Sequence, residues 1–341
     1  KNLNNNLKYS HNKKLFFEDL LSKNIIEDLP LIYLEGFNQI RKLAVNYKVA
    51  NIKTLLTAQN SYNYSSLYNF WFAENREKLD LIILQHGGNN CTHKLALEEI
   101  HWKIAKEIWT FGASNSSNEY PMYHYNSSIY LNSLSRKKMS KRNQISKILL
   151  VITSSSRYLR QFGAGMVTVE ILEHLETTFQ FLYELPEYIT VTIRLPNIDY
   201  GWNLKERILV RNFKCKIIFD NKKTNFNSSI YNHDLCVTNY LGSTFIEAIS
   251  LDFPVMALIN DKFEIFHNNA VSKFKNLLDN DVIFNNPNSL AKVIIENSMN
   301  LNKLIDSKDR ALSLEIFKEK FARTSEEWDI KWLSRLEYLN H

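Results

Sequence analysis

The stretch LCVTNYLGSTFIEAISLDFPVMAL, residues 235–258, has the pattern of a strand, a tight turn, a helix and a second strand. Its first four residues are apolar, as in a short buried strand, and Gly242 permits a sharp turn soon afterwards. Thr244 and Glu247 have the spacing of a capping box, so we expect the helix to begin at Thr244. Val255–Ile259 is predicted to form the second strand.

A helix that opens just past the carboxyl end of a strand presents free N–H groups and a partial positive charge. We therefore expect the backbone of Gly242, Ser243 and Thr244 to form an anion site, to which the two hydroxyl groups contribute. In the alternative interpretation the turn is the one that any αβ unit has, and Glu247 only caps its own helix.

The composition of the 341 residues suggests two domains of an ordinary globular protein, with 45% hydrophobic and 23% charged residues. The net charge of +6 suits an anionic ligand or a membrane-surface acceptor, and is too small to indicate nucleic acid. No apolar run has the length of a membrane span, and the first residues have no signal-peptide pattern. The opening on Lys1 without an initiator methionine suggests a fragment boundary. Three cysteines without a CxxC pair indicate reduced thiols and a cytoplasmic location.

Helical and strand patterns alternate in two sets along the chain. Strands are predicted at 51–57, 79–84, 147–153, 188–194 and 214–219, and helices at 35–47, 65–78, 94–108, 168–183, 289–299, 312–324 and 326–339. This alternation implies parallel sheets, which bind ligands beyond the carboxyl ends of their strands.

Between the two sets, residues 114–143 are rich in Ser, Asn and Tyr and end in the basic run SRKKMSKR. This run is able to contact anionic lipid or substrate, although we favour a solvated linker. The predicted organisation is an N-terminal domain at 1–130, a basic linker at 131–146, a nucleotide-binding domain at 147–320 and a C-terminal helix at 321–341. Two tryptophans in that helix suggest that it docks on the protein.

The segment Gln85-His86-Gly87-Gly88 follows the predicted strand 79–84, where a ligand would bind. His86 is able to donate to a phosphate or carboxylate, or to act as an acid or base near neutral pH, unless it is bonded to the backbone of its own loop. The two glycines allow a ligand to approach the backbone closely, and Gln85 is expected to contact substrate.

Two acidic residues, Glu98 and Glu99, begin the next predicted helix. One of them is a candidate catalytic carboxylate. The alternative is that a helix N-terminus favours Glu for electrostatic reasons alone.

Asp199 is the first candidate for an essential carboxylate, because a carboxylate is able to act as a base for a hydroxyl group or as a nucleophile. Arg194 is able to bind a carboxylate or phosphate through two parallel hydrogen bonds, or else to form a structural pair with Asp199. Tyr200 and Trp202 are expected to contact substrate, with Trp202 either stacked on a sugar or base or buried in the core. A phosphate is expected at the strand end formed by Ser154, Ser155, Ser156 and Arg157.

Five segments occur in order: LTAQNSYNYSSLYNFWFAE at 56–74, LQHGG at 84–88, ITSSSRYLRQFG at 152–163, RLPNIDYGW at 194–202 and VTNYLGSTFIEAISLDFPVMAL at 237–258. Together they resemble a family of O-antigen and surface-polysaccharide transferases that is similar to the bacterial β-Kdo glycosyltransferases, which use CMP-activated 3-deoxy-octulosonate (Kdo). The pair formed by QHGG and RLPNIDYGW is the most specific part of this resemblance.

The resemblance implies an α/β fold of the GT-B type, with two Rossmann-like domains facing a cleft and a C-terminal helix returning to the first domain. It implies transfer of a CMP-linked, Kdo-like acid to a glycan or lipid-linked glycan acceptor, in the cytoplasm or at the inner face of the membrane as a peripheral contact. No metal or other cofactor is expected, because CMP has one phosphate and no Asp-x-Asp pair stands where a metal-bound diphosphate would need it. The implied donor-binding residues are Ser154, Ser155, Ser156, Arg157, Arg194, Asn239, Gly242, Ser243, Thr244 and Glu247.

Two other functions stay open at this point. One is a glycerol- or ribitol-phosphate transferase that uses a CDP-alcohol on the same fold. The other is a non-catalytic glycan-binding or scaffold domain, which is favoured by departures from the family pattern at Asn89-Asn90 and Lys106-Glu107. The acceptor, the anomeric outcome and the oligomeric state are not fixed by the sequence.

Overall fold

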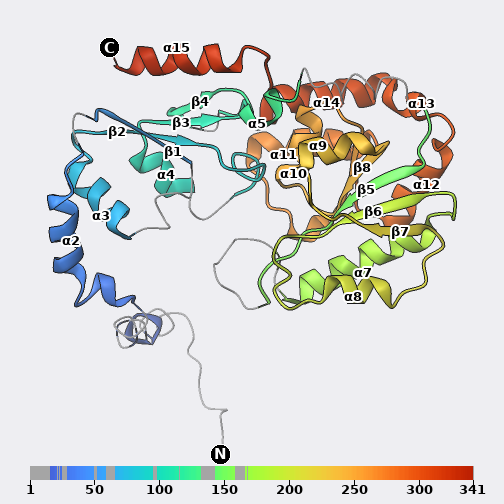
Figure 1. The fold of residues 1–341 in the computed structure, drawn as a ribbon, viewed down its shortest axis with the longest axis horizontal. Coiled ribbons are helices and arrows are strands. Elements are labelled where there is room, and N and C mark those ends of the chain that lie inside the picture. Colours follow the sequence, from blue (N-terminus) through green and yellow to red (C-terminus); the bar gives the residue numbers. More distant parts are fainter. Residues whose placement is uncertain are drawn as a thin grey trace, which may run out of the picture. The chain divides into compact units, whose positions relative to one another are not determined.

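The protein is seen here in a computed structural model (Figure 1). The structure describes residues 16–20, 22, 24, 29–49, 52–58, 66–94, 98–114, 116–131, 143–157, 166 and 168–340. The chain divides into two compact units, Lys1–Asp80 and Leu81–His341. The predicted basic run at 135–142 lies outside the described residues, and the predicted domain limits at 130, 146 and 320 stay a prediction.

The first unit is built around two helices. Its elements are η1 (Leu31–Tyr33), α2 (Phe37–Asn46), β1 (Thr54–Ala58) and α3 (Ser66–Asn75). A small apolar cluster that includes Ala44, Phe70 and Trp71 holds α2 against α3. The ion pair between Arg41 and Glu74, 2.6 Å apart, joins the same two helices. The two helices and the strand predicted in this region are confirmed.

The second unit begins with parallel strands and short helices. These are β2 (Asp80–Leu84), α4 (Glu98–Ile104), β3 (Glu107–Thr110), β4 (Glu119–Pro121) and α5 (Tyr125–Ser128). β3 pairs in parallel with both β2 and β4. The helix predicted over 94–108 is therefore too long, because all four residues of β3 are buried in the sheet. Burial against neighbouring strands outweighs local helical pattern here.

A six-stranded parallel sheet forms the rest of the second unit. It contains β5 (Lys147–Val151), β6 (Thr190–Arg194), β7 (Lys216–Phe219), β8 (Leu235–Thr238), β9 (Val255–Leu258) and β10 (Ile283–Phe284). Their order is β10-β9-β8-β5-β6-β7, so the chain winds in opposite directions from β5 and β8. The carboxyl ends of these two adjacent strands form a topological switch point, where α/β sheets bind ligands.

Helices cover both faces of this sheet (Figure 1). One apolar cluster lies under α7 (Thr168–Glu184), α8 (Leu204–Leu209), α12 (Pro287–Glu296) and α13 (Leu301–Ile305). The other lies under α9 (Phe226–Ser229), α10 (Ser243–Ser250), α11 (Asn268–Asp279) and α14 (Lys308–Phe321). Two single-turn helices, η3 (Ile230–Asn232) and η4 (Asp261–Phe263), complete the second unit's connections.

The last helix, α15 (Trp328–Asn340), returns to the three strands at the start of the second unit (Figure 1). Trp332 packs with Ile82, Trp109 and Met122, and the two indole rings meet edge to face at 5.1 Å. Arg335 donates to both carboxylate oxygens of Glu107 on β3. The predicted return of a C-terminal helix to the first αβ set is confirmed.

Candidate functional site

The N-terminus of α10 opens at the switch point. The helix begins at Ser243, one residue earlier than predicted, and its N-cap residue Gly242 makes no side-chain cap. The predicted capping box is therefore wrong. The hydroxyl of Thr244 donates instead to the Tyr240 hydroxyl at 2.7 Å. Because the first amides of a helix have no intrahelical acceptor, residues 243–245 present donors at this end of the sheet.

The loop after β2 packs directly on the N-terminus of α10. The Gly88 amide donates to Ser243 Oγ at 3.2 Å. A Cβ atom at Gly88 would lie 2.5 Å from Ile246 Cγ1, and one at Gly87 would lie 2.8 Å from Ser243 Oγ. The close backbone approach that these glycines allow is thus to α10, and contact with a ligand stays a prediction.

The two neighbouring side chains of this loop differ in exposure. Gln85 is buried, donates to the carbonyls of Gly87 and Asn90, and accepts from the Phe111 amide at 2.7 Å. It therefore shapes the loop rather than facing outwards. His86 is exposed beside it, two residues before Gly88, whose amide donates to Ser243.

Glu247 lies one turn into α10 from Ser243, on the same side of the helix. Burial raises the pKa of its carboxyl to about 7, and the positive charge of Arg194 opposes this shift. Both effects are expected where a carboxyl enters a poorly hydrated space near a cation. Glu247 is therefore able to exchange a proton near neutral pH.

Arg194 at the end of β6 is held by a residue that the sequence analysis missed. Its guanidinium lies 2.5 Å from Asp220 and also donates to the Thr224 carbonyl. The predicted alternative of an Arg194–Asp199 pair is wrong. The signal was present, because Asp220 immediately follows the predicted strand 214–219.

Asp199 has a local structural role. Its two carboxylate oxygens accept from the amides of Asn203 at 2.7 Å and Leu204 at 2.9 Å. Asp199 thereby caps α8, whose own N-cap residue Asn203 makes no side-chain cap. This capping role was not predicted, and the expected role of Asp199 as the essential carboxylate stays a prediction.

Two other expected ligand contacts are buried. Trp202 lies in the core and donates to the Ser155 carbonyl at 2.7 Å, so the core alternative is the one observed. Asn239 is buried and its side chain accepts from the Thr153 amide at 2.7 Å, which ties the ends of β5 and β8 together. Its carbonyl also accepts from the His174 ring. The Asn239 side chain therefore joins the two strand ends at the switch point. Contrary to expectation, it is buried and does not face a donor.

The loop after β5 is bonded to the loop after β6. Ser154 Oγ donates to the Ile198 carbonyl at 3.1 Å and Ser155 Oγ to the Met166 carbonyl at 2.7 Å. Arg157 is exposed and donates to the Gly201 carbonyl at 3.3 Å. Two further predicted residues, Ser156 and Tyr200, are half-buried in the same loops.

The structure describes the side chain of only one of the two candidate acidic residues of α4. The helix begins at Glu98, whose side chain lies outside the described part of the chain. Glu99 is exposed. Among the described side chains, that of Glu99 forms no hydrogen bond or ion pair with the α10 N-terminus.

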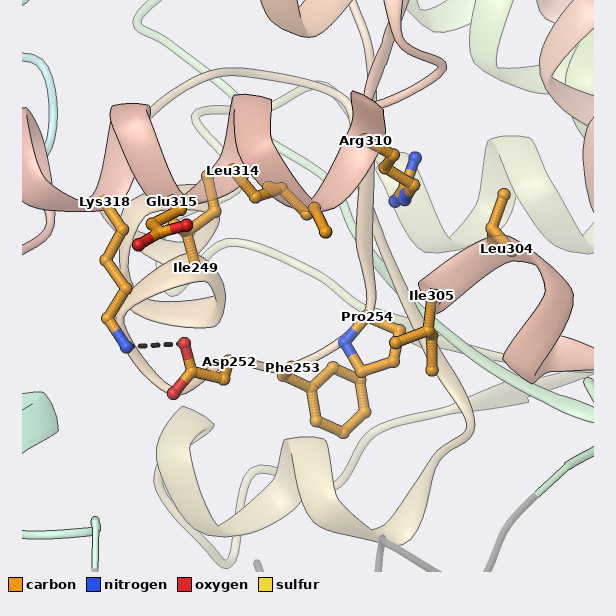
Figure 2. Close-up of a pocket in the computed structure, with 11 residues that line it drawn as sticks. Ile249, Asp252, Phe253, Pro254, Leu304, Ile305, Arg310, Leu314, Glu315 and Lys318 are labelled. Carbon is orange, nitrogen blue, oxygen red and sulfur yellow. Dashed lines mark hydrogen bonds and ion pairs between the residues drawn. The ribbon is translucent and has the colours of Figure 1, made fainter. Parts of the chain in front are cut away.

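A pocket of about 370 Å³ lies at the amino end of β9, whereas the switch point lies at the carboxyl ends of the strands (Figure 2). Figure 2 shows the ion pair between Asp252 and Lys318, 2.5 Å apart, at one side and Arg310 at the other. Arg310 donates to the Val255 carbonyl at 2.8 Å, and burial lowers its pKa to about 10. None of the predicted site residues lines this pocket.

Three further features concern only the part of the chain that the structure describes. No group of three or more His, Cys, Asp or Glu residues is arranged to hold a metal ion. No described helix combines the length and apolar character needed to cross a bilayer. The three cysteines are buried free thiols.

Comparisons with known proteins agree with this architecture. A family model described as "LIC12162 family transferase" matches residues 1–336. No curated protein matches the sequence.

Solved structures with a similar fold are distant in sequence. MnaA of S. aureus with UDP has a TM-score of 0.51 at 10% identity, covering 90% of this chain and 80% of its own. The wall teichoic acid polymerase TagF, in a variant soaked with CDPG, has a TM-score of 0.51 at 12% identity, covering 96% and 98%. MurG of Acinetobacter baumannii has a TM-score of 0.50 at 12% identity, covering 88% and 77%. These likenesses show a GT-B fold, as predicted.

Proposed function

The chain belongs to the LIC12162 family of transferases, and from this premise we propose that it is a glycosyltransferase with its donor site at the α10 N-terminus. The observation that carries the proposal is the contact between Gly88 and Ser243, which holds the His86 loop against an open helix mouth at the switch point. Donor phosphate at the mouth would then lie beside an exposed acid–base group.

The donor we propose is a CMP-linked ulosonic acid, similar to Kdo, for assembly of a bacterial surface polysaccharide. Its phosphate would accept from the amides of residues 243–245, where the helix dipole favours negative charge. The sugar carboxylate needs a cation, and Arg157 supplies an exposed guanidinium after β5. Arg194 is a weaker candidate, because Asp220 already neutralises it. Glu247 is proposed to contact the nucleoside.

In the proposed reaction the acceptor hydroxyl attacks the anomeric carbon and the bond from that carbon to the phosphate oxygen breaks. CMP leaves with the bonding electron pair, and His86 takes the acceptor proton. The acceptor is a glycan or lipid-linked glycan, and the proposed site of action is the cytoplasmic face of the membrane. No metal ion is required in this scheme.

The direct test measures CMP release from CMP-Kdo in the presence of a glycan acceptor. His86→Ala should lower kcat by about 10²- to 10⁴-fold, the usual contribution of a general base. Asp199→Ala should retain most of its kcat at temperatures where it stays folded, because Asp199 caps a helix. Equal turnover by wild type and His86→Ala would remove His86 from the mechanism.

A CDP-alcohol phosphotransferase is the second candidate, because the TagF structure soaked with CDPG and this chain cover each other almost completely. Calorimetric titration with CMP, CDP, UDP and GDP separates the two. Tightest binding of CMP supports the ulosonate transferase, and tightest binding of CDP supports the alcohol-phosphate transferase. Binding of none of them would indicate a non-catalytic glycan-binding or scaffold protein.

A further inference from the structure

The first unit carries a short segment that combines basic residues with exposed apolar side chains. We name residues 41–49, RKLAVNYKV, the α2 surface segment. Four large apolar side chains in it are exposed: Leu43 at 60%, Val45 at 55%, Tyr47 at 59% and Val49 at 42%. Because they lie within seven consecutive residues, chain geometry alone keeps them close together.

The charge of this part of the chain has one sign. Residues 36–73 contain four basic residues, Arg41, Lys42, Lys48 and Lys53, and no Asp or Glu. Arg41 pairs with Glu74. Lys42 and Lys48 are exposed, and no carboxylate of the described residues forms an ion pair with them. The α2 surface segment therefore has free positive charge beside exposed apolar groups.

We propose that the α2 surface segment binds the surface of an anionic lipid bilayer. Basic residues near such a surface are attracted by its negative potential, and exposed aliphatic and aromatic groups enter the headgroup boundary. Lysine side chains suit this arrangement, since their stems lie along apolar material while the ammonium stays hydrated.

Other occupants fit the segment less well. A second copy of the chain would place the same positive charges opposite each other, which opposes association. Nucleic acid would satisfy the lysines but would leave three aliphatic side chains, Leu43, Val45 and Val49, without suitable partners. Anionic lipid satisfies both the charge and the apolar groups.

The inference is independent of the donor chemistry proposed above, because it involves no residue of the α10 site. It also applies if the chain uses another donor. Failure of either proposal would leave the other intact.

The test is co-sedimentation of the full chain with vesicles of phosphatidylcholine, with and without phosphatidylglycerol. Binding should require phosphatidylglycerol and should weaken as salt is raised. Each basic residue near the surface contributes about fivefold to binding, so Lys42→Glu/Lys48→Glu should bind at least about 25-fold more weakly. Leu43→Ser/Val49→Ser should also weaken binding, including at high salt.

A matched control reverses two exposed lysines elsewhere, Lys303→Glu/Lys308→Glu, and should bind vesicles as the wild type does. Unchanged circular dichroism and melting temperature should accompany each variant. Equal binding to neutral vesicles, or full binding by Lys42→Glu/Lys48→Glu, would overturn the proposal. So would loss of dimers in that variant by light scattering, or displacement from an RNA probe without any vesicle binding.

Discussion

Glu247 shows how one residue can report on the environment of the site. Its pKa of about 7 lies above the ordinary value of 4.5 because burial disfavours the ionised carboxylate. Below pH 4.5 the group is protonated in both the folded and the unfolded chain. Between pH 4.5 and about pH 7 the unfolded chain binds fewer protons than the folded chain. The stabilisation that comes from the raised pKa is therefore lost as the pH rises through 7.

We therefore expect Glu247→Gln to remove this loss of folding stability at rising pH. The free energy of unfolding of the wild type, relative to Glu247→Gln, should fall by up to about 3 kcal/mol between about pH 4 and pH 8. Denaturant titrations across this range measure the difference. Glu99→Gln, at an exposed position, serves as the control. A flat difference for Glu247→Gln would show that the carboxyl is well hydrated.

At the scale of single residues the sequence identified segments better than it identified side-chain roles. The segments around His86, Arg194 and Gly242 do reach the carboxyl edges of their sheets, because strand periodicity locates strand ends. The partners of Asp199 and Asn239 were not predictable in this way. Asn239 bonds to Thr153, 86 residues away, and only the pairing of β5 with β8 brings them together.

The contact between the β2 loop and α10 can be tested by adding a single methyl group. In Gly88→Ala the new Cβ would meet Ile246 and also the Gly242 carbonyl oxygen at 2.7 Å, and backbone cannot yield easily. We expect a destabilisation of about 1–3 kcal/mol and weaker nucleotide binding. Gly87→Ala should destabilise the fold less, because its nearest neighbour is the hydroxyl of Ser243, which can rotate, although this rotation breaks the bond from Gly88. Denaturation midpoints and calorimetry measure both; equal effects would contradict the geometry.

Elements were predicted well where burial and local pattern agree. The five strands predicted for the six-stranded sheet are all present, and only the two-residue β10 was not predicted. Glu107 and Ile108, the first two residues of β3, were taken for helix because so short a segment has no period that distinguishes the two. The α10 N-terminus was displaced by one residue, since Thr244 bonds to Tyr240 rather than back to its own helix.

At the scale of the whole molecule, the docking of α15 depends on one partly buried ion pair. Arg335 lies between the rings of Tyr120 and Tyr338 while it pairs with Glu107. Among the described residues, Arg335→Ala would leave the Glu107 carboxylate buried with the Trp109 indole as its one remaining side-chain donor. We expect a loss of about 3–5 kcal/mol, the usual effect of removing one partner of a buried pair.

The control for this prediction is Lys292→Ala, which breaks an exposed pair with Glu296 and should cost about 0.5 kcal/mol or less. Thermal and denaturant unfolding measure both variants. If Arg335→Ala were as mild as Lys292→Ala, α15 would be held by its tryptophans alone.

The return of α15 also sets an order of assembly during synthesis. Arg335 lies 228 residues after Glu107, so the ribosome needs about 11 to 46 s to deliver the helix after β3 has been made. During that interval the apolar face formed by Ile82, Trp109 and Met122 has no cover from α15. The strands of this face are made early but are covered late. On the nascent chain they therefore present an apolar surface of the kind that chaperones bind.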